Sequence, residues 1–182
     1  MFLFYDCINQ NENNSHHYKG ILFEKLLSEY LSNNGYDVHI RTKHNSLEYD
    51  LEGIDKTTKL SIVGEAKAYQ DSISGQILSS FAGKLMGMGI VEKKVHGLFL
   101  STSPLTPDAK DFLDSISHFG ISCYTGEELF KKIIETFRMP TKEQVFNKTI
   151  ELGHNPLFDF LLTTNYGYRR LVIASNSDAL TP

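Results

Sequence analysis

The triplet Glu65-Ala66-Lys67 constrains the fold of this chain most strongly, because it ends an apolar run that begins at Leu60. A run of this length and composition is typical of a buried strand, and residues two apart on a strand share a face. Asp50 stands in the preceding candidate strand, beside an apolar residue. The pattern therefore predicts two neighbouring strands whose ends bring two carboxylates and one ammonium group together.

These residue types suit a divalent cation and a phosphodiester. Two carboxylates at neighbouring strand ends repel each other unless a cation lies between them, and hard oxygen ligands suit Mg²⁺ or Mn²⁺. The ammonium group of Lys67 can then orient an attacking water or stabilise charge on the phosphoryl group. Taken alone, the triplet also fits an ordinary solvated strand face. Glu48 and Glu52 compete with Asp50 for the role of first carboxylate, since the three residues share one strand face.

Hydrophobic periodicity along the rest of the chain predicts alternating helices and strands. The predicted helices are 20–34, 73–88, 106–118 and 125–137. The predicted strands are 37–43, 49–54, 60–66, 95–101 and 121–124. A polar turn at 55–59 joins the second and third strands, and the first three strands are predicted to form an antiparallel meander, whereas the strand, helix, strand order that follows implies parallel pairing. The fold class predicted is therefore α/β, with a mixed central β-sheet flanked by helices.

A series of motifs runs from about Gly20 to Leu129 in the order of these elements. They are Gly20-x-x-Phe23-Glu24, Gly35-Tyr36-x-Val38, Asp50, Glu65-Ala66-Lys67-Ala68-Tyr69, Gln76, Phe81-Ala82-Gly83-Lys84 and the segments 97–109 and 121–129. Together they resemble the PD-(D/E)xK nuclease superfamily, and more narrowly its Mrr-type restriction endonuclease domains. Two positions depart from the family pattern: Glu65 stands where several members carry Gln, and Tyr49 stands where Gly is usual.

The resemblance implies a restriction-endonuclease-like fold and a metal-dependent endonuclease that hydrolyses DNA phosphodiester bonds. Asp50, Glu65 and the carbonyl of Ala66 would bind Mg²⁺, for which Mn²⁺ would substitute. Lys67 would position the nucleophile. The implied partner is double-stranded DNA, in restriction or antiviral defence, with a fused or associated sensor or NTPase module. The alternatives are an inactive nuclease-like module that binds nucleic acid or assembles with other proteins, and a nuclease for RNA or junctions.

Three further residues are candidates for supporting roles. Glu24 borders the apolar stripe of the first helix, where it either reaches water or, as the resemblance implies, supports the metal site. Gln76 and Lys84 fall on one polar stripe of the 73–88 helix, two turns apart. We expect Gln76 to contact water or phosphate and Lys84 to bind nucleic acid, although residues at this spacing occur on any exposed helix face.

The composition bears on the cellular location and the binding partners expected for the protein. No apolar run approaches the roughly 20 residues that span a membrane, and the N-terminus lacks a signal-like pattern, so we expect a cytoplasmic protein with no membrane partner. Cys7 and Cys123 are too few for a disulfide framework or a zinc site. His16 and His17 are expected in a polar loop. The net charge of −4 indicates that any contact with nucleic acid is local.

Pro140 marks the predicted boundary between a nuclease domain of residues 1–138 and a tail of residues 139–182. In the tail, Thr141 to Gln144 predicts a capping box that opens a short helix, and two strands around a turn at 165–167 predict a β-hairpin. A similar capping box is predicted for Thr125 to Glu128. A lone hairpin is marginal in water, so the tail either packs on the nuclease domain or begins a further module. Because cutting a duplex takes two active centres, we expect a homo-oligomer during cleavage.

Overall fold

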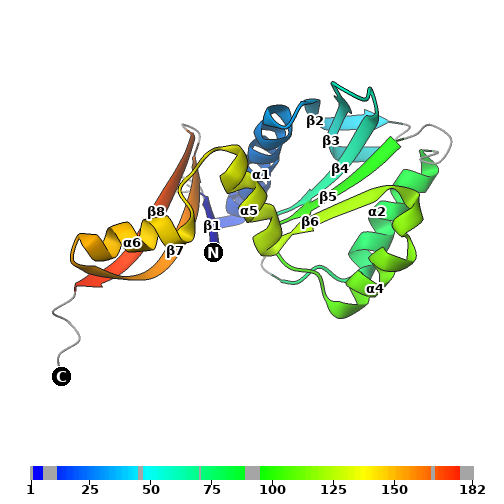
Figure 1. Cartoon of the computed structure of the whole chain (residues 1–182). Coiled ribbons are helices and arrows are strands. Elements are labelled where there is room, and N and C mark those ends of the chain that lie inside the picture. Colours follow the sequence, from blue (N-terminus) through cyan, green and yellow to red (C-terminus); the bar gives the residue numbers. More distant parts are fainter. Residues whose placement is uncertain are drawn as a thin grey trace.

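Two β-sheets organise the chain (Figure 1), and the computed structural model describes residues 2–5, 12–44, 47–69, 71–88, 95–164 and 167–176. The larger sheet has the strand order β2-β3-β4-β5-β6 and the smaller one the order β1-β7-β8. The strands of the larger sheet are β2 (Tyr36–His44), β3 (Leu47–Asp55), β4 (Ser61–Lys67), β5 (Val95–Ser101) and β6 (Ile121–Thr125). The helices that accompany it are α1 (Glu12–Asn33), α2 (Gly75–Gly87), α4 (Pro107–Ser115) and α5 (Gly126–Thr136), with a 3-10 turn at Ser117–Phe119.

The larger sheet is mixed, as the sequence predicts. β2, β3 and β4 pair antiparallel, and the polar turn before β4 is closed by the Asp55 carboxylate, which accepts hydrogen bonds from the backbone of Thr57 and Thr58. β4, β5 and β6 pair parallel, with α2 and α4 in the connections between them. The predicted α/β class with a mixed central β-sheet flanked by helices is thus confirmed.

Helices cover both faces of the larger sheet (Figure 1). On one face α1 and α5 enclose a core that includes Phe23, Leu27 and Ile133, packed on Leu51 and Ile62 of the sheet. On the other face α2 and α4 enclose a second core. This second core includes Tyr49, Val63, Phe81, Leu85, Phe99 and Ala109. Successive side chains of β3 and β4 point alternately into one core and into the other. A break in this alternation therefore turns a side chain from one core to the other.

The first helix is longer than its sequence pattern predicts. α1 begins at Glu12, so His16 and His17 lie in a helix and not in the polar loop expected for them. Gly20 costs only about 1 kcal/mol inside a helix, which a helix of 22 residues packed on a sheet tolerates. At its other end the left-handed Gly35, with φ of +90°, ends the helix as predicted. None of the described helices is long and apolar enough to cross a lipid bilayer.

The two predicted capping boxes have different outcomes. Thr141 accepts a hydrogen bond from the Gln144 backbone, and the Gln144 side chain accepts one from the Thr141 backbone, so this box is confirmed. The box predicted for Thr125 and Glu128 is wrong, since the Thr125 side chain makes no capping hydrogen bond. A capping box needs helical backbone directly after the cap, whereas Gly126 has a φ of +55°.

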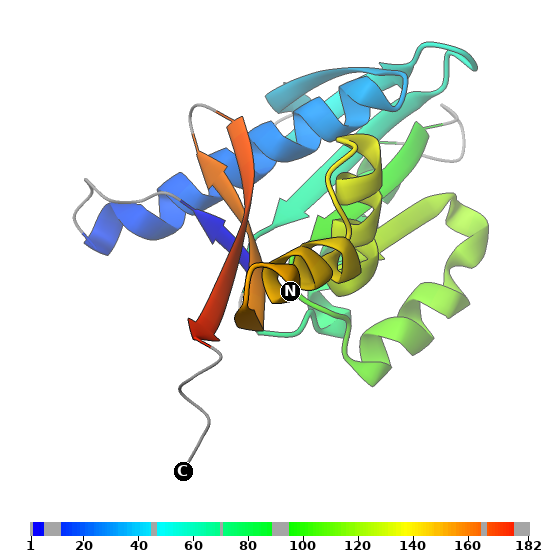
Figure 2. The ribbon, with the colours of Figure 1, turned by 60° about the vertical axis from the view of Figure 1, so that its left-hand side comes forward.

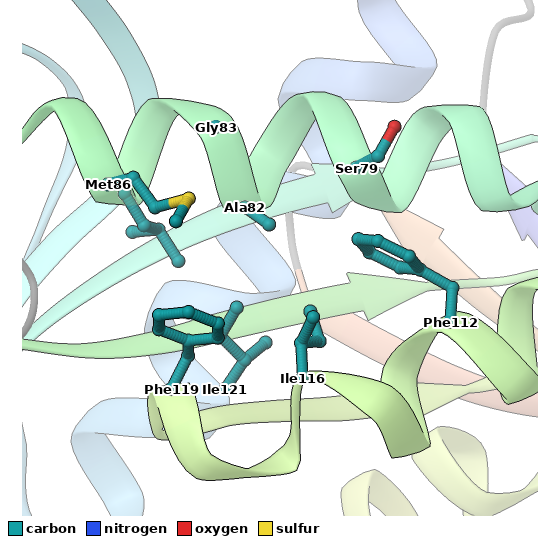
Figure 3. Close-up of a pocket in the computed structure, with 9 residues that line it drawn as sticks. Ser79, Ala82, Gly83, Met86, Phe112, Ile116, Phe119 and Ile121 are labelled. Carbon is teal, nitrogen blue, oxygen red and sulfur yellow. The ribbon is translucent and has the colours of Figure 1, made fainter.

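A cavity of about 270 Å³ lies between α2 and the segment that runs from α4 to β6 (Figure 3). Phe112, Ile116 and Phe119 line it from one side, and Ala82 and Met86 of α2 line it from the other. Its lining contains no carboxylate or ammonium group. It is therefore separate from the polar residues at the end of β4.

The smaller sheet joins the two ends of the described chain. α6 (Lys142–Glu151) leads into the antiparallel hairpin of β7 (His154–Thr164) and β8 (Gly167–Asn176), and β1 (Phe2–Tyr5) pairs parallel with β7. Figure 2 shows this sheet beside α1. Leu161 of β7 is 1% exposed and belongs to the same core as the buried face of α1. The ring of Tyr168 packs against that of Phe137 in a tilted arrangement, with centroids 5.0 Å apart. The predicted hairpin thus packs on the part of the chain that precedes residue 139.

The division at residue 138 gives a testable prediction. A chain of residues 1–138 is expected to unfold cooperatively, but with a free energy of unfolding lower by at least about 2 kcal/mol, because it loses the buried Leu161 side chain. Leu161→Ala in the whole chain measures that contact alone, and Leu171→Ala, at a site 46% exposed, is the matched control. Chemical denaturation provides the comparison. A truncated chain with no cooperative transition would show that the smaller sheet is an integral part of the nuclease fold.

Candidate active site

β3 stops pairing with β4 where it reaches Asp50. The ladder between β3 and β4 runs from Ile54 and Ser61 to Leu51 and Gly64. Tyr49 and Leu51 enter opposite cores, although residues two apart on a regular strand share a face. The alternation therefore breaks at Asp50, and its Oδ2 accepts a hydrogen bond from the Ala66 backbone N–H at 2.8 Å. A side chain thus takes the place of a ladder partner and fixes a carboxylate beside the end of β4.

Glu65 lies at the centre of a cluster of charged side chains. It is 8% exposed, and its two carboxylate oxygens contact different lysines. Lys67 Nζ lies 2.6 Å from Glu65 Oε1, and Lys84 Nζ of α2 lies 2.8 Å from Glu65 Oε2. Lys67 Nζ also lies 3.5 Å from Asp50 Oδ2. The structure thus brings together Asp50, Glu65, Lys67 and Lys84, with an ammonium group between the two carboxylates.

The protonation state of Lys67 limits its chemical role. Burial of the ammonium group opposes its charge, but the hydrogen bond to Glu65 and the negative charges of Glu65 and Asp50 outweigh burial and raise the pKa of Lys67 above its ordinary value. Lys67 therefore stays protonated at neutral pH. In this arrangement it can donate hydrogen bonds and stabilise negative charge, but it cannot accept a proton.

Tyr49 anchors α2 next to this cluster. It is fully buried, and its hydroxyl donates a hydrogen bond to the Lys84 carbonyl at 3.3 Å. Burial raises the pKa of Tyr49, and the charges of Glu65 and Glu52 raise it further, so the hydroxyl remains a donor. The position at which this chain departs from the usual Gly thus helps to place Lys84 beside Glu65.

The backbone geometry favours Asp50 over its two competitors as the first carboxylate. Glu52 lies opposite Val63 inside the β3–β4 ladder, one step before the ladder ends. Glu48 is exposed, and its carbonyl lies 3.5 Å from Lys84 Nζ. Of the three acids, Asp50 is the one whose carboxylate contacts both Ala66 and Lys67.

Glu24 is held by a residue that the sequence analysis did not single out. Glu24 is 9% exposed on α1, and Arg41 binds it through Nε at 2.8 Å and Nη2 at 3.4 Å. The hydrogen bond to Glu24 and the charges of Glu24, Asp50 and Glu48 raise the pKa of Arg41 despite partial burial. Arg41 therefore links Glu24 to the surroundings of Asp50. Nothing in the sequence pairs these two residues, because their contact forms only when α1 packs across the sheet.

In the part of the chain that the structure describes, Gln76 makes no hydrogen bond to the charged cluster. It is exposed in the first turn of α2, and within the described part of the chain no hydrogen bond joins its side chain to Asp50, Glu65 or Lys67. Its position leaves it free to meet a ligand that approaches along α2. The structure thus does not bring it together with the other predicted site residues.

The donor groups of the cluster fit a hard cation. Among the described residues, no three or more His, Cys, Asp and Glu side chains are grouped so that they could hold a metal ion. A structural zinc site, in contrast, takes four ligands of these types. Mg²⁺ is commonly bound through one or two carboxylates and several waters. Asp50, Glu65 and the Ala66 carbonyl supply that kind of donor set, because the Asp50 carboxylate is tied to the backbone between the other two groups.

Comparison with known proteins identifies the family. Residues 16–133 match the family model of the Mrr catalytic domain, described as a restriction endonuclease. This chain belongs to the restriction endonuclease family. The type IV methyl-directed restriction enzyme EcoKMrr of Escherichia coli (strain K12) is 28% identical over 119 residues. That match covers 62% of this chain and 37% of the enzyme, so it spans well under half of the relative.

Two solved structures are similar to this family member. The protein of unknown function AF1548 has a TM-score of 0.54 at 9% identity, over 72% of this chain and 78% of that chain. A repair endonuclease from Pyrococcus abyssi has a TM-score of 0.47 at 17% identity, over 66% of this chain and 49% of that chain. The first likeness supports the α/β fold alone.

The ion pair between Glu24 and Arg41 gives a second prediction. Arg41→Ala is expected to lower the free energy of unfolding by about 1–2 kcal/mol, because the buried Glu24 carboxylate loses its two hydrogen bonds. Arg41 is 41% exposed, which keeps the effect below that of a buried pair. Thermal and urea unfolding measure it, with the exposed Arg169→Ala as control. Equal effects of the two substitutions would mean that Arg41 does not stabilise Glu24.

Proposed function

We propose that this restriction endonuclease family member is a Mg²⁺-dependent endonuclease that hydrolyses phosphodiester bonds of double-stranded DNA. The observation that supports this most directly is the Asp50 carboxylate, tied to the Ala66 backbone beside Glu65 and Lys67. The two carboxylates belong to different strands, so only the fold brings them within reach of one ammonium group.

Asp50, Glu65 and the carbonyl of Ala66 would hold the Mg²⁺ ion, and Mn²⁺ would substitute for it. When bound, such a cation lowers the pKa of water and neutralises charge on the phosphoryl oxygens. Lys67 stays protonated, so its part is to orient the attacking water by donating a hydrogen bond, and to stabilise the negative charge of the transition state. The proton of the water must then pass to another acceptor or to solvent.

The remaining candidates support this reaction. Glu24 and Arg41 sit on the α1 side, where their ion pair steadies the surroundings of Asp50. Gln76 and Lys84 belong to α2, from which Gln76 would contact water or phosphate and Lys84 the DNA backbone. These contacts are local, as the net charge of −4 requires.

The biological setting that we propose is restriction or antiviral defence in the cytoplasm. A nuclease of this kind acts on foreign DNA without damaging its host only when another element decides the target. We therefore propose a fused or associated sensor or NTPase module that supplies recognition and activation.

A second candidate function is an inactive nuclease-like module that binds nucleic acid or assembles with other proteins. Both oxygens of Glu65 contact ammonium groups, so this carboxylate is neutralised without any metal. A site that stays in this state would bind phosphate but would not cut it. Plasmid cleavage with Mg²⁺ or Mn²⁺, with and without a chelator, discriminates the two functions.

The proposed roles give a third prediction. Asp50→Ala and Glu65→Ala are expected to lower plasmid cleavage by at least ~100-fold through loss of metal ligands, while DNA binding stays intact or strengthens. Lys67→Ala is expected to lower cleavage as much but to retain Mn²⁺ binding. Glu24→Gln and Gln76→Ala are expected to lower the rate by about tenfold, since both residues hold supporting positions.

Calorimetric Mn²⁺ titration beside plasmid cleavage measures both effects. Unchanged Mn²⁺ affinity in Asp50→Ala would shift the metal-ligand role to Glu48 or Glu52. Full cleavage by Lys67→Ala would contradict the role given to this lysine and favour the binding module.

Association gives a fourth prediction. Each chain carries one cluster of Asp50, Glu65 and Lys67, so cutting both strands of a duplex calls for two chains. We expect the rate of double-strand cleavage to rise more steeply than linearly with protein concentration. Quantifying nicked and linear plasmid over a dilution series tests this. A strictly first-order dependence for linear product would mean that single chains cut both strands in turn.

A further inference from the structure

Lys84 contacts the carboxylate that the proposed function assigns to a metal ion. Glu65 Oε2 accepts a hydrogen bond from Lys84 Nζ at 2.8 Å, while Glu65 Oε1 contacts Lys67 Nζ at 2.6 Å. The Glu65 side chain is only 10% exposed, so water cannot replace these partners on all sides. A cation that coordinates Glu65 therefore competes with these ammonium groups, because it either takes a lone pair that one of them occupies or brings a second positive charge to the same carboxylate.

The two lysines differ in how firmly they are held. Both backbones are fixed, since the Lys67 carbonyl accepts a hydrogen bond from the Thr102 backbone at 3.0 Å and the Lys84 carbonyl accepts one from the Tyr49 hydroxyl at 3.3 Å. The difference lies in the ammonium groups: that of Lys67 is also 3.5 Å from Asp50 Oδ2, so it keeps a carboxylate partner if Glu65 is withdrawn. Apart from Glu65, the ammonium group of Lys84 contacts only the Glu48 carbonyl, at 3.5 Å, among the described residues. Lys84 is also the more exposed of the two, at 30% against 20%.

We propose that Lys84 is an internal counter-ion of Glu65 that competes with the metal ion and is released when the metal binds. This inference rests on the proposed function, because it concerns the same carboxylate. Breaking a charge-assisted hydrogen bond before coordination weakens cation affinity by roughly tenfold. The released ammonium group then lies beside the site, where it meets a DNA phosphate. Binding of metal and binding of DNA therefore reinforce each other through Lys84.

A competing role and a positioning role of Lys84 predict opposite changes in metal affinity when Lys84 is replaced. If Lys84 only held Glu65 in the right place for the cation, its removal would weaken cation binding. If Lys84 competes, its removal strengthens cation binding while impairing contact with DNA. The direction of the change in metal affinity therefore distinguishes the two roles.

The first experiment is calorimetric titration of Mn²⁺ into the whole chain. Lys84→Met keeps an unbranched apolar stem without the charge, and it is expected to bind Mn²⁺ roughly tenfold more tightly than the wild type. Lys84→Gln is expected to change the affinity in the same direction, and it serves if the Met variant is unstable. Lys84→Arg restores a charged partner and is expected to stay near the wild type. Lys110→Met, an exposed position on α4, is the matched control and is expected to leave affinity unchanged.

The second measurement is the affinity for a short DNA duplex by fluorescence anisotropy, with and without Ca²⁺ as a hard cation, and with gels to check that the duplex stays intact. The wild type is expected to gain several-fold more affinity on adding Ca²⁺ than Lys84→Met, because only the wild type frees an ammonium group. Equal gains in the two proteins would overturn the release of Lys84 toward DNA.

The outcomes separate this inference from the proposed function. If Mn²⁺ binds to the wild type in a manner that depends on Asp50, and Lys84→Met binds it equally or more weakly, competition by Lys84 is wrong and the proposed function stands. If neither the wild type nor Lys84→Met binds Mn²⁺, both are wrong. Tighter binding in Lys84→Met with no change in Lys110→Met supports both.

Discussion

The hydrogen bond from the Ala66 backbone to the Asp50 carboxylate is the contact on which the candidate site depends. It forms where β3 leaves the ladder with β4, so a backbone donor that would otherwise lack a strand partner is satisfied by a side chain. The same break sends Tyr49 into the core on the α2 side, although Leu51 enters the core on the α1 side. One irregularity in a strand thus creates the carboxylate pair and anchors the helix that supplies Lys84.

The balance of charge at the end of β4 explains how such a site persists in a folded protein. Burying a carboxylate is unfavourable unless it is paired, and removing one partner of a buried pair is strongly destabilising. Glu65 has two lysines, and Glu24 has Arg41. Each buried acid of the site is therefore neutralised by residues of the chain itself. Metal binding at Glu65, as we propose it, would consequently exchange one counter-ion for another and would not fill an uncompensated negative site.

Helices on both faces of the larger sheet supply charged residues to the candidate site. α1 brings Glu24 toward the edge strand β2, and α2 brings Lys84 toward β4. The apolar cavity between α2 and α4 (Figure 3) has none of these charged groups in its lining. The smaller sheet shares the core on the α1 side through Leu161. Its packing therefore adds to the core that holds α1, and no hydrogen bond or ion pair joins its described side chains to Asp50, Glu65 or Lys67.

The spacing of nearby residues in the sequence was enough to predict most helices and strands and one pair of site residues. The period of apolar residues marked α1 and the strands of the larger sheet, and the i, i+2 spacing placed Glu65 and Lys67 on one face. Tertiary structure alone decided the contacts between distant segments: Arg41 with Glu24, Lys84 with Glu65, and β1 with β7. It also decided the break at Asp50 and the early start of α1. The physical reason is that periodicity reports which face of an element is buried, whereas ionic partners and strand neighbours are chosen only when those faces pack together.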